Sequence, residues 1–203
     1  MNTSRSPLFL FTRVVARIIL PLRFRVKLQG LPHLPSRGPA VLIPKHQQWW
    51  DVPLLGTFIP RPLHFLAKQE LFATPLSRFY INRLGGLAVN RGNPLKSLET
   101  FRAIPSLLEK ESFLVLFPEG TYYPETVGPG KWRLIQMILR SQQKQAIDPI
   151  AFVPIGIRYF SGASSGSGSV EISVGPALNE TNPQQAEGFT QHLLTQVKEL
   201  SKL

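Results

Sequence analysis

Short apolar runs alternate with longer stretches of helical character along the whole chain. Six runs bounded by turn residues predict strands, at residues 39–44, 63–68, 86–90, 112–117, 150–160 and 170–175. Four stretches between and after them predict helices, at residues 74–84, 94–111, 131–142 and 183–203. Several of the runs are apolar at every position, which predicts strands covered on both faces. We therefore expect an α/β fold with a mostly buried mixed β-sheet flanked by helices.

The chain is long enough for one substantial hydrophobic core. Its 203 residues, 43% hydrophobic and 17% charged, are typical of a globular domain rather than of a disordered chain. We expect one folded domain at residues 31–203, preceded by a separate segment at residues 1–30. The Gly- and Ser-rich stretch at residues 161–169 predicts a flexible connection between two strands. Pro105 predicts a kink or break in its helix.

The N-terminal segment has the pattern of an amphipathic helix. Its apolar run is interrupted by Arg13 and Arg17, so it is too short for a membrane-spanning helix of about 20 apolar residues. No small-residue cleavage site follows, which argues against a secretory signal. On a helix, one face would carry Leu8, Phe11, Val15 and Ile18. The pattern indicates either a helix lying in a membrane interface, with its arginines toward lipid phosphates, or a helix packed on its own domain.

A strong excess of basic residues indicates an anionic partner. Lys and Arg number 23 against 12 Asp and Glu, a formal net charge of +11. The partner could be nucleic acid, an anionic lipid surface or an acidic carrier protein. The chain has no cysteine, which excludes a disulfide framework, a thiolate zinc site and a cysteine nucleophile. Because His33, His64 and His192 lack ligand-like spacing, we expect no metal site.

The first acidic residue of the chain follows a histidine at a spacing that suits general-base catalysis. Asp51 comes after fifty residues that include eight Arg and Lys but no acid, and five positions after His46. A carboxylate beside an imidazole fixes its tautomer and stabilises the imidazolium. The two side chains meet if His46 lies in the loop after strand 39–44 and Asp51 in the first turn of a following helix, at the carboxyl edge of the sheet. Alternatively, Asp51 could serve only as a helix cap.

Three further sequence blocks follow this pair in order. They are GGLAVNR at residues 85–91, FPEGT at residues 117–121 and FVPIGI at residues 152–157. Together with the pair they resemble the PlsC-like glycerolipid acyltransferases related to 1-acylglycerol-3-phosphate acyltransferase. That family carries an H-x4-D block, a block of Gly and Arg six positions apart, an F-P-E-G-T block and a V-P block in the same order. The resemblance covers about residues 25–175.

The resemblance implies an activity and a role for each block. It implies an enzyme that moves a fatty acyl group from an acyl-carrier protein or acyl-CoA to the hydroxyl of a lysophospholipid, 1-acyl-sn-glycerol-3-phosphate above all. His46 would be the general base and Asp51 its orienting partner. The acceptor and its phosphate would be bound by Arg91, Glu119, Gly120 and Thr121. Pro154 would shape the acyl pocket. We expect no cofactor besides the thioester, and an acyltransferase domain at the cytoplasmic face of a membrane.

The chain departs from the family pattern at a position that bears on the acceptor. Tyr122 and Tyr123 follow Thr121 where the family usually has Arg and Ser. The family arginine is thought to share the acceptor phosphate, and Lys131 or Arg133 could restore its charge if their loop folds inward. Alternatively, the acceptor is a different lysolipid whose headgroup contacts the two tyrosines.

Two hypotheses from other functional classes compete with acyl transfer. GASSG at residues 162–166 matches a nucleophile elbow with Ser164, but that elbow requires a helix after the turn, and a predicted strand follows here. The other hypothesis is a basic protein that binds nucleic acid or lipid without catalysis. The bases of a bound nucleic acid would stack on Trp49, Trp50 and Trp132. No basic run or binding module accompanies these tryptophans.

Overall fold

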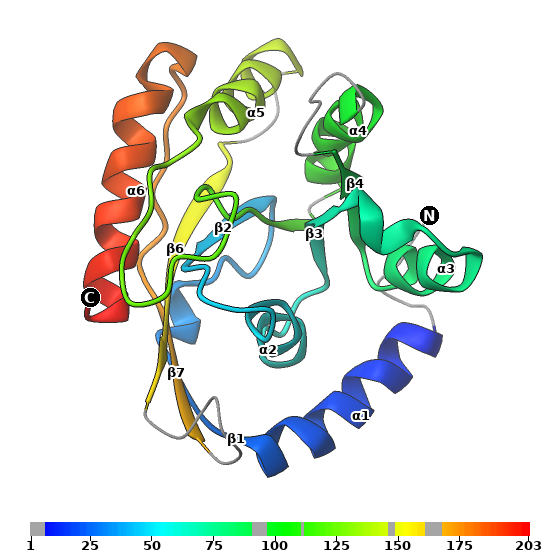
Figure 1. Ribbon diagram of the computed structural model, residues 1–203. Helices are drawn as coiled ribbons and strands as arrows, with labels where there is room; N and C mark the ends of the chain where they lie inside the picture. The colour runs from blue at the N-terminus through cyan, green and yellow to red at the C-terminus, as the bar shows by residue number, and fades with distance from the viewer. Residues whose placement is uncertain (1–6, 91–96, 111, 146–148, 161–167) are drawn as a thin grey trace.

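A seven-stranded mixed β-sheet runs through the centre of the molecule (Figure 1). The computed structural model describes residues 7–90, 97–110, 112–145, 149–160 and 168–203. The strands lie in the order β1-β7-β6-β2-β5-β3-β4, and only the β6–β7 pair is antiparallel. Their bounds are β1 Phe24–Gln29, β2 Ala40–Pro44, β3 Leu63–Lys68, β4 Gly86–Val89, β5 Phe113–Val115, β6 Ala151–Tyr159 and β7 Gly168–Val174.

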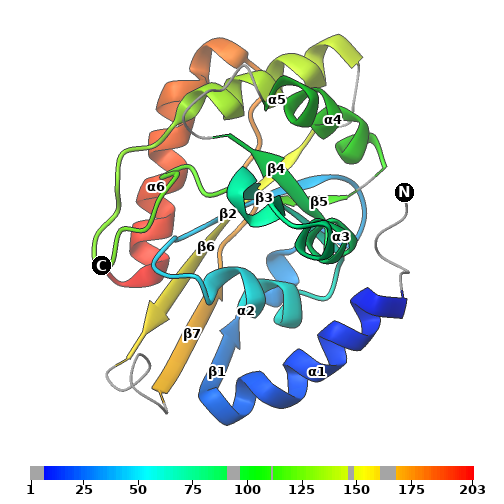
Figure 2. The ribbon, with the colours of Figure 1, turned by 45° about the vertical axis from the view of Figure 1, so that its right-hand side comes forward.

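Helices cover both faces of this sheet (Figures 1 and 2). One face packs against α1 (Pro7–Arg23) and α2 (Asp51–Phe58). The other face packs against α4 (Leu98–Glu109), α5 (Trp132–Gln145) and α6 (Ala186–Ser201). A further helix, α3 (Pro75–Arg83), lies beside β4 at the sheet edge. Three short 3-10 helices are η2 (Leu31–His33), η3 (Gln69–Phe72) and η5 (Pro183–Gln185).

The central strand β2 shows why the apolar runs form strands in this fold. Ala40 and Leu42 belong to the core beneath α1 and α2, whereas Val41 and Ile43 belong to the core beneath α4, α5 and α6. Successive side chains of a strand point to opposite faces, so a strand between two helix layers must be apolar at every position. The predicted α/β architecture with a mixed sheet flanked by helices is therefore confirmed.

One strand was not among those predicted. Residues 24–29 form β1, which pairs in parallel with β7 along its whole length at the edge of the sheet. Its sequence FRVKLQ alternates apolar and polar residues, the pattern of a half-covered strand. The prediction grouped these residues with the N-terminal segment because they directly follow the apolar run.

Two predictions about loops and breaks can be compared with the fold. No break occurs at Pro105, since α4 continues on both sides of it. Its neighbours Ile104 and Leu108 are fully buried in the core, and this burial offsets the backbone hydrogen bond that a proline removes. Most of the Gly- and Ser-rich stretch, residues 161–167, lies outside the described residues. The chain leaves it directly into β7.

The N-terminal helix α1 is partly packed and partly exposed. Phe9 and Leu20 are buried, and Arg13 donates hydrogen bonds from its guanidinium to the carbonyl oxygens of Thr57 and Ile59 at the C-terminal end of α2. Several of its other apolar side chains face outward. Among the helices of the described residues, none combines the length and the apolar character needed to cross a bilayer.

Candidate active site

His46 and Asp51 meet at the carboxyl end of β2. His46 lies two residues beyond the end of the strand, and Asp51 is the first residue of α2. A tight turn joins them, in which the Asp51 amide donates to the carbonyl of Gln48 over 3.2 Å. The imidazole Nδ1 lies 2.9 Å from the Asp51 Oδ2. The pair is therefore formed by a loop and a helix start rather than along one helix.

The Asp51 carboxylate is fully buried and accepts hydrogen bonds at both oxygens. Oδ2 accepts from the backbone amides of Gln47 and Gln48 at 2.7 and 2.9 Å, besides the imidazole. Oδ1 accepts from the hydroxyl of Tyr159 at 2.7 Å. Burial and the neighbouring Asp51 raise the pKa of Tyr159 well above its ordinary value, so the phenol keeps the proton that it donates. Four donors thus fix the carboxylate in place.

This arrangement determines which ring nitrogen of His46 can act as a base. An acceptor-only carboxylate requires the proton on Nδ1, which leaves the lone pair on Nε2. The His46 side chain is only 7% exposed, and its imidazole stacks on Phe117 with ring centroids 3.8 Å apart. Tyr122 lies on it at a tilt, with centroids 4.4 Å apart. The two aromatic rings restrict the orientation of the imidazole.

A buried ion pair holds the backbone of His46. The Lys45 ammonium and the Glu119 carboxylate are 2.8 Å apart, and both side chains have no exposed surface. Glu119 also accepts from the His46 amide at 2.9 Å and from the Gly128 amide at 2.9 Å. The His46 carbonyl accepts from Lys45 at 3.0 Å and from the Tyr123 amide at 3.0 Å. The FPEGT block is thereby tied to the loop that contains His46 by charge-assisted hydrogen bonds.

The turn after β5 brings Lys131 against the FPEGT block. Gly120 has a φ of 71°, in the left-handed region, and a side chain there would collide with the Lys131 side chain. The Lys131 amide donates to the carbonyl of Pro118 at 2.9 Å. The Lys131 side chain therefore lies against Gly120, while the residue as a whole stays exposed. Thr121 is exposed on the outer side of the turn.

A cleft opens next to this turn at the carboxyl edge of the sheet. It extends from the ends of β3 and β4 to the first turns of α5, and Phe117 and Gly120 form part of its wall. Its polar lining includes Asn90, Lys131 and Arg133. Its apolar lining includes Leu66, Leu116 and Met137. A cleft with an apolar wall, two cations and the Phe117 ring that stacks on His46 suits an amphipathic anion.

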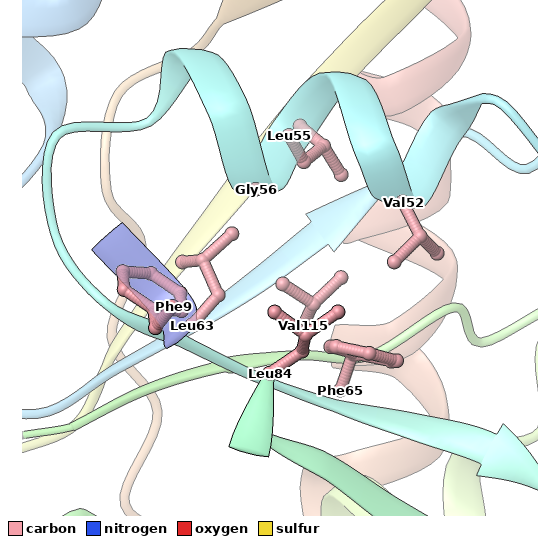
Figure 3. A pocket seen from close by; sticks show the side chains of 8 residues that line it. All are labelled: Phe9, Val52, Leu55, Gly56, Leu63, Phe65, Leu84 and Val115. Carbon is pink, nitrogen blue, oxygen red and sulfur yellow. The ribbon is translucent and has the colours of Figure 1, made fainter. Parts of the chain in front are cut away.

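A second, closed cavity lies beneath α2 (Figure 3). The residues that surround it include Phe9 of α1, Leu55 and Gly56 of α2, Leu84 after α3 and Phe65 of β3. Its volume is about 30 Å³, and its lining is almost entirely apolar. A cavity of this size without polar partners does not hold an ordered water molecule.

The other predicted site residues lie in different surroundings. Arg91 falls outside the described residues, although the preceding Asn90 lines the cleft. Pro154 lies inside β6, opposite Ile43 of β2, and its carbonyl accepts from the Gly175 amide at 2.9 Å. Ser164 also falls outside the described residues, between β6 and β7. In the part of the chain that the structure describes, no group of three or more acidic or histidine side chains could hold a metal ion.

Sequence reasoning missed two contributors to this site. Tyr159 is 108 positions from Asp51, and only the adjacency of β6 and β2 brings them together. Lys45 is not among the predicted site residues, and its partner Glu119 is 74 positions away. A lysine that immediately follows a fully apolar strand was the available signal, because a buried ammonium needs a carboxylate.

Comparison with known proteins agrees with this geometry. The model of the Acyltransferase family matches residues 25–158. A 1-acyl-sn-glycerol-3-phosphate acyltransferase of Bacillus subtilis is 26% identical over 205 residues, covering 95% of this chain and 96% of that protein. One of Pseudomonas aeruginosa is 29% identical over 170 residues, covering 83% of this chain and 62% of that protein. The chain thus spans less than two thirds of the Pseudomonas protein.

Two further proteins bear on the acceptor and on the fold. A lyso-ornithine lipid O-acyltransferase of Pseudomonas aeruginosa is 36% identical over 107 residues, which are 53% of this chain and 39% of that protein. The crystal structure of the 1-acyl-sn-glycerophosphate acyltransferase PlsC from Thermotoga maritima superposes with a TM-score of 0.73 at 18% identity. It covers 96% of this chain and 80% of that one. The family model covers well over half of the sequence and contains both His46 and Asp51, so the chain belongs to the Acyltransferase family.

Proposed function

We propose that the chain transfers a fatty acyl group from a thioester donor to the free hydroxyl of a lysophospholipid, with His46 as the general base. The observation that carries this proposal is the hydrogen-bonded chain Tyr159–Asp51–His46, which leaves the imidazole Nε2 as the proton acceptor. Family membership and the names of the relatives agree with acyl transfer.

The proposed reaction is one displacement without a covalent enzyme intermediate. Nε2 of His46 removes the proton of the acceptor hydroxyl as its oxygen attacks the thioester carbonyl carbon. The tetrahedral intermediate collapses, the carbon–sulfur bond breaks, and the thiolate leaves and takes the proton back from the imidazolium. Asp51 stabilises the imidazolium between these steps, and no cofactor besides the thioester is needed.

We propose 1-acyl-sn-glycerol-3-phosphate as the principal acceptor, which would yield phosphatidic acid. Lys131, whose side chain lies against Gly120, and Arg133 are exposed residues that line the same cleft, and this supports a phosphate-binding role that replaces the family arginine. Arg91 is proposed as a further phosphate ligand on the resemblance alone. Thr121 and Gly120 would complete the acceptor-binding turn, and Pro154 the acyl pocket.

The role of Glu119 is proposed to be indirect. Its carboxylate is occupied by Lys45 and by two backbone amides. It would therefore position the base and the acceptor-binding turn rather than touch a negatively charged acceptor, which it would repel.

A second acceptor is favoured by one specific observation. Tyr122 lies on the His46 imidazole, where the family usually has an arginine, and one relative is named a lyso-ornithine lipid O-acyltransferase. An acceptor without a phosphate would need no arginine at that position. Acyl transfer to such a lysolipid, with Tyr122 beside its headgroup, is the alternative activity.

We propose that the protein works at the cytoplasmic face of a membrane as a peripheral or monotopic enzyme. The exposed apolar side of α1 supports membrane association, and the net charge of +11 suits anionic lipid. The same charge suits an acidic acyl-carrier protein, so both acyl-carrier protein and acyl-CoA are proposed donors.

Acyl transfer by the purified protein tests the acceptor directly. Labelled acyl-carrier protein and acyl-CoA are offered with lysophosphatidic acid, lyso-ornithine lipid and lysophosphatidylcholine. We expect the highest kcat/KM with lysophosphatidic acid, and a rise in the KM for that acceptor, but not for the donor, in Arg133→Ala and Lys131→Ala. A preference for lyso-ornithine lipid that persists in these variants would favour the alternative, and transfer to no acceptor would contradict the proposal.

A further inference from the structure

The helix α3 stands outside both hydrophobic cores. Among the described residues, no side chain between Pro75 and Arg83 is buried, and none belongs to either core cluster. Its Leu76 side chain is 78% exposed and Phe79 is 53% exposed, and Leu71 in the adjoining η3 is 53% exposed. Burial is what makes large apolar residues favourable, and more than half of each of these three residues remains exposed.

Local interactions nevertheless hold α3 in a defined conformation. Thr74 and Ser77 form a reciprocal capping box at its start, and Pro75 occupies a first-turn position. A helix of nine residues is too short to be stable by propensity alone. The capping interactions therefore stabilise a helix whose apolar side chains do not pack into either hydrophobic core of the chain.

The N-terminal part of α1 lies beside α3 (Figures 1 and 2). The Tyr80 hydroxyl donates to the Thr12 hydroxyl at 3.3 Å, and Phe9 and Leu84 both line the closed cavity between the two helices and α2 (Figure 3). On α1, the outward apolar side chains are Leu10, Phe11, Val14, Ile18, Ile19 and Leu22. The two helices thus present one larger apolar surface, which we call the α1–α3 surface.

The charges on α1 and α3 are of one sign, and the adjoining η3 adds one exposed acidic residue, Glu70. Neither helix contains an acidic residue, whereas α1 carries Arg13, Arg17 and Arg23, and α3 carries Arg78 and Arg83. Arg17 and Arg78 are exposed, and the Arg83 guanidinium lies 4.8 Å from the centre of the Phe79 ring. Apolar side chains flanked by arginines match the boundary between acyl chains and anionic headgroups.

We propose that η3 and α3 form a second bilayer contact beside α1, so that the enzyme inserts the α1–α3 surface into an anionic membrane leaflet. This inference rests on the membrane association proposed above. It assigns the contact to two separate segments rather than to the N-terminal helix alone. Leu71, Leu76 and Phe79 enter the acyl-chain boundary, while Arg78 and Arg83 meet lipid phosphates.

Vesicle sedimentation tests the apolar part of the proposal. The full chain is mixed with vesicles of phosphatidylglycerol and phosphatidylcholine, and its partition coefficient is compared with that of L76N/F79N. We expect the double substitution to lower the coefficient by about tenfold or more, because two apolar side chains lose their transfer into lipid. Since both side chains are solvent-exposed in the free protein, the variant should melt like the wild type.

A matched pair of charge variants tests the electrostatic part. Arg78→Gln should lower binding to these vesicles by about fivefold, whereas Arg140→Gln should not. Arg140 is also an exposed helix arginine, but it lies on α5, at the opposite end of the molecule from α1 in both views (Figures 1 and 2). Added salt should abolish the difference between the two variants.

The outcomes separate this inference from the proposed activity, because vesicle binding requires no acyl transfer. Wild-type binding by L76N/F79N, together with a loss of binding in the α1 variant F11N/I18N, would overturn the inference and leave membrane association by α1 intact. A change in oligomeric state of L76N/F79N without a change in vesicle binding would also overturn it, and would identify an interface between two copies of the chain.

Discussion

The buried ion pair between Lys45 and Glu119 is expected to stabilise both the fold and the catalytic loop. Lys45→Met keeps most of the side-chain volume but leaves the Glu119 carboxylate without a counterion in a site with no exposed surface. Removing one partner of such a pair costs about 3–5 kcal/mol. For a protein of this size, that corresponds to a fall in Tm of roughly 6–20 °C. Glu119→Gln, which leaves the ammonium unpaired, should cost a similar amount.

The double variant K45M/E119Q distinguishes a coupled pair from two independent contributions. Because it contains no unpaired charge, its free energy of unfolding should exceed the additive expectation by at least about 2 kcal/mol. Urea unfolding followed by tryptophan fluorescence measures each value. Lys144→Met, the same change at an exposed helix position, should leave the free energy of unfolding unchanged. Strict additivity of the two single variants, or a Lys45→Met protein as stable as the wild type, would refute this reasoning.

Three further predictions concern the hydrogen-bonded chain Tyr159–Asp51–His46, the cavity and the pH dependence of stability. Tyr159→Phe removes a hydrogen bond to the Asp51 carboxylate and should lower kcat by about tenfold while the KM of either substrate stays unchanged; a shift in KM alone would place Tyr159 in substrate binding. Gly56→Ala should raise the free energy of unfolding by about 1 kcal/mol, since a methyl group there meets no atom within 4 Å in a helix beside the closed cavity. Gly188→Ala in α6 is the control, because a methyl group there also meets nothing within 4 Å but Gly188 lines no part of that cavity, and its gain in the free energy of unfolding should be no larger. A lower free energy of unfolding in Gly56→Ala would show that the cavity has no room for the methyl group. Burial lowers the pKa of His64 below its ordinary value of 6.5, against a smaller raising effect of a hydrogen bond with Gly85. The unfolded chain therefore binds a proton that the folded protein does not, so stability is lost as the pH falls below about 6.5, and His64→Gln should reduce that loss in urea unfolding between pH 7 and 5.

The sequence was most informative where one strand and the loop that follows it contain the residues of the predicted site. The run at 39–44 is apolar at every position, which identifies a central strand, and His46 and Asp51 follow it within one turn. Their meeting at the carboxyl edge of the sheet could therefore be predicted from local pattern. The Phe24–Gln29 strand was missed even though its residues alternate, because an edge strand beside an apolar helix resembles a continuation of that segment.

The contacts that stabilise the catalytic loop could not be predicted from local pattern. Tyr159 reaches Asp51 only because β6 lies next to β2, and Glu119 reaches Lys45 only because β5 lies on the other side of β2. Strand order is a property of the whole chain, and no spacing in the sequence encodes it. The exposed apolar side chains of α3 were likewise hidden in the sequence, where the segment resembles any other amphipathic helix.

The most direct test of the account is acyl transfer by purified His46 variants under single-turnover conditions. His46→Ala and His46→Gln are compared with the wild type, using a labelled acyl donor and a saturating lysolipid acceptor, and circular dichroism melting verifies the fold of each. The account predicts that the rate of the chemical step falls by about 10²–10⁴-fold in both variants while donor binding is retained. Transfer at an undiminished rate by either folded variant would contradict His46 as the general base.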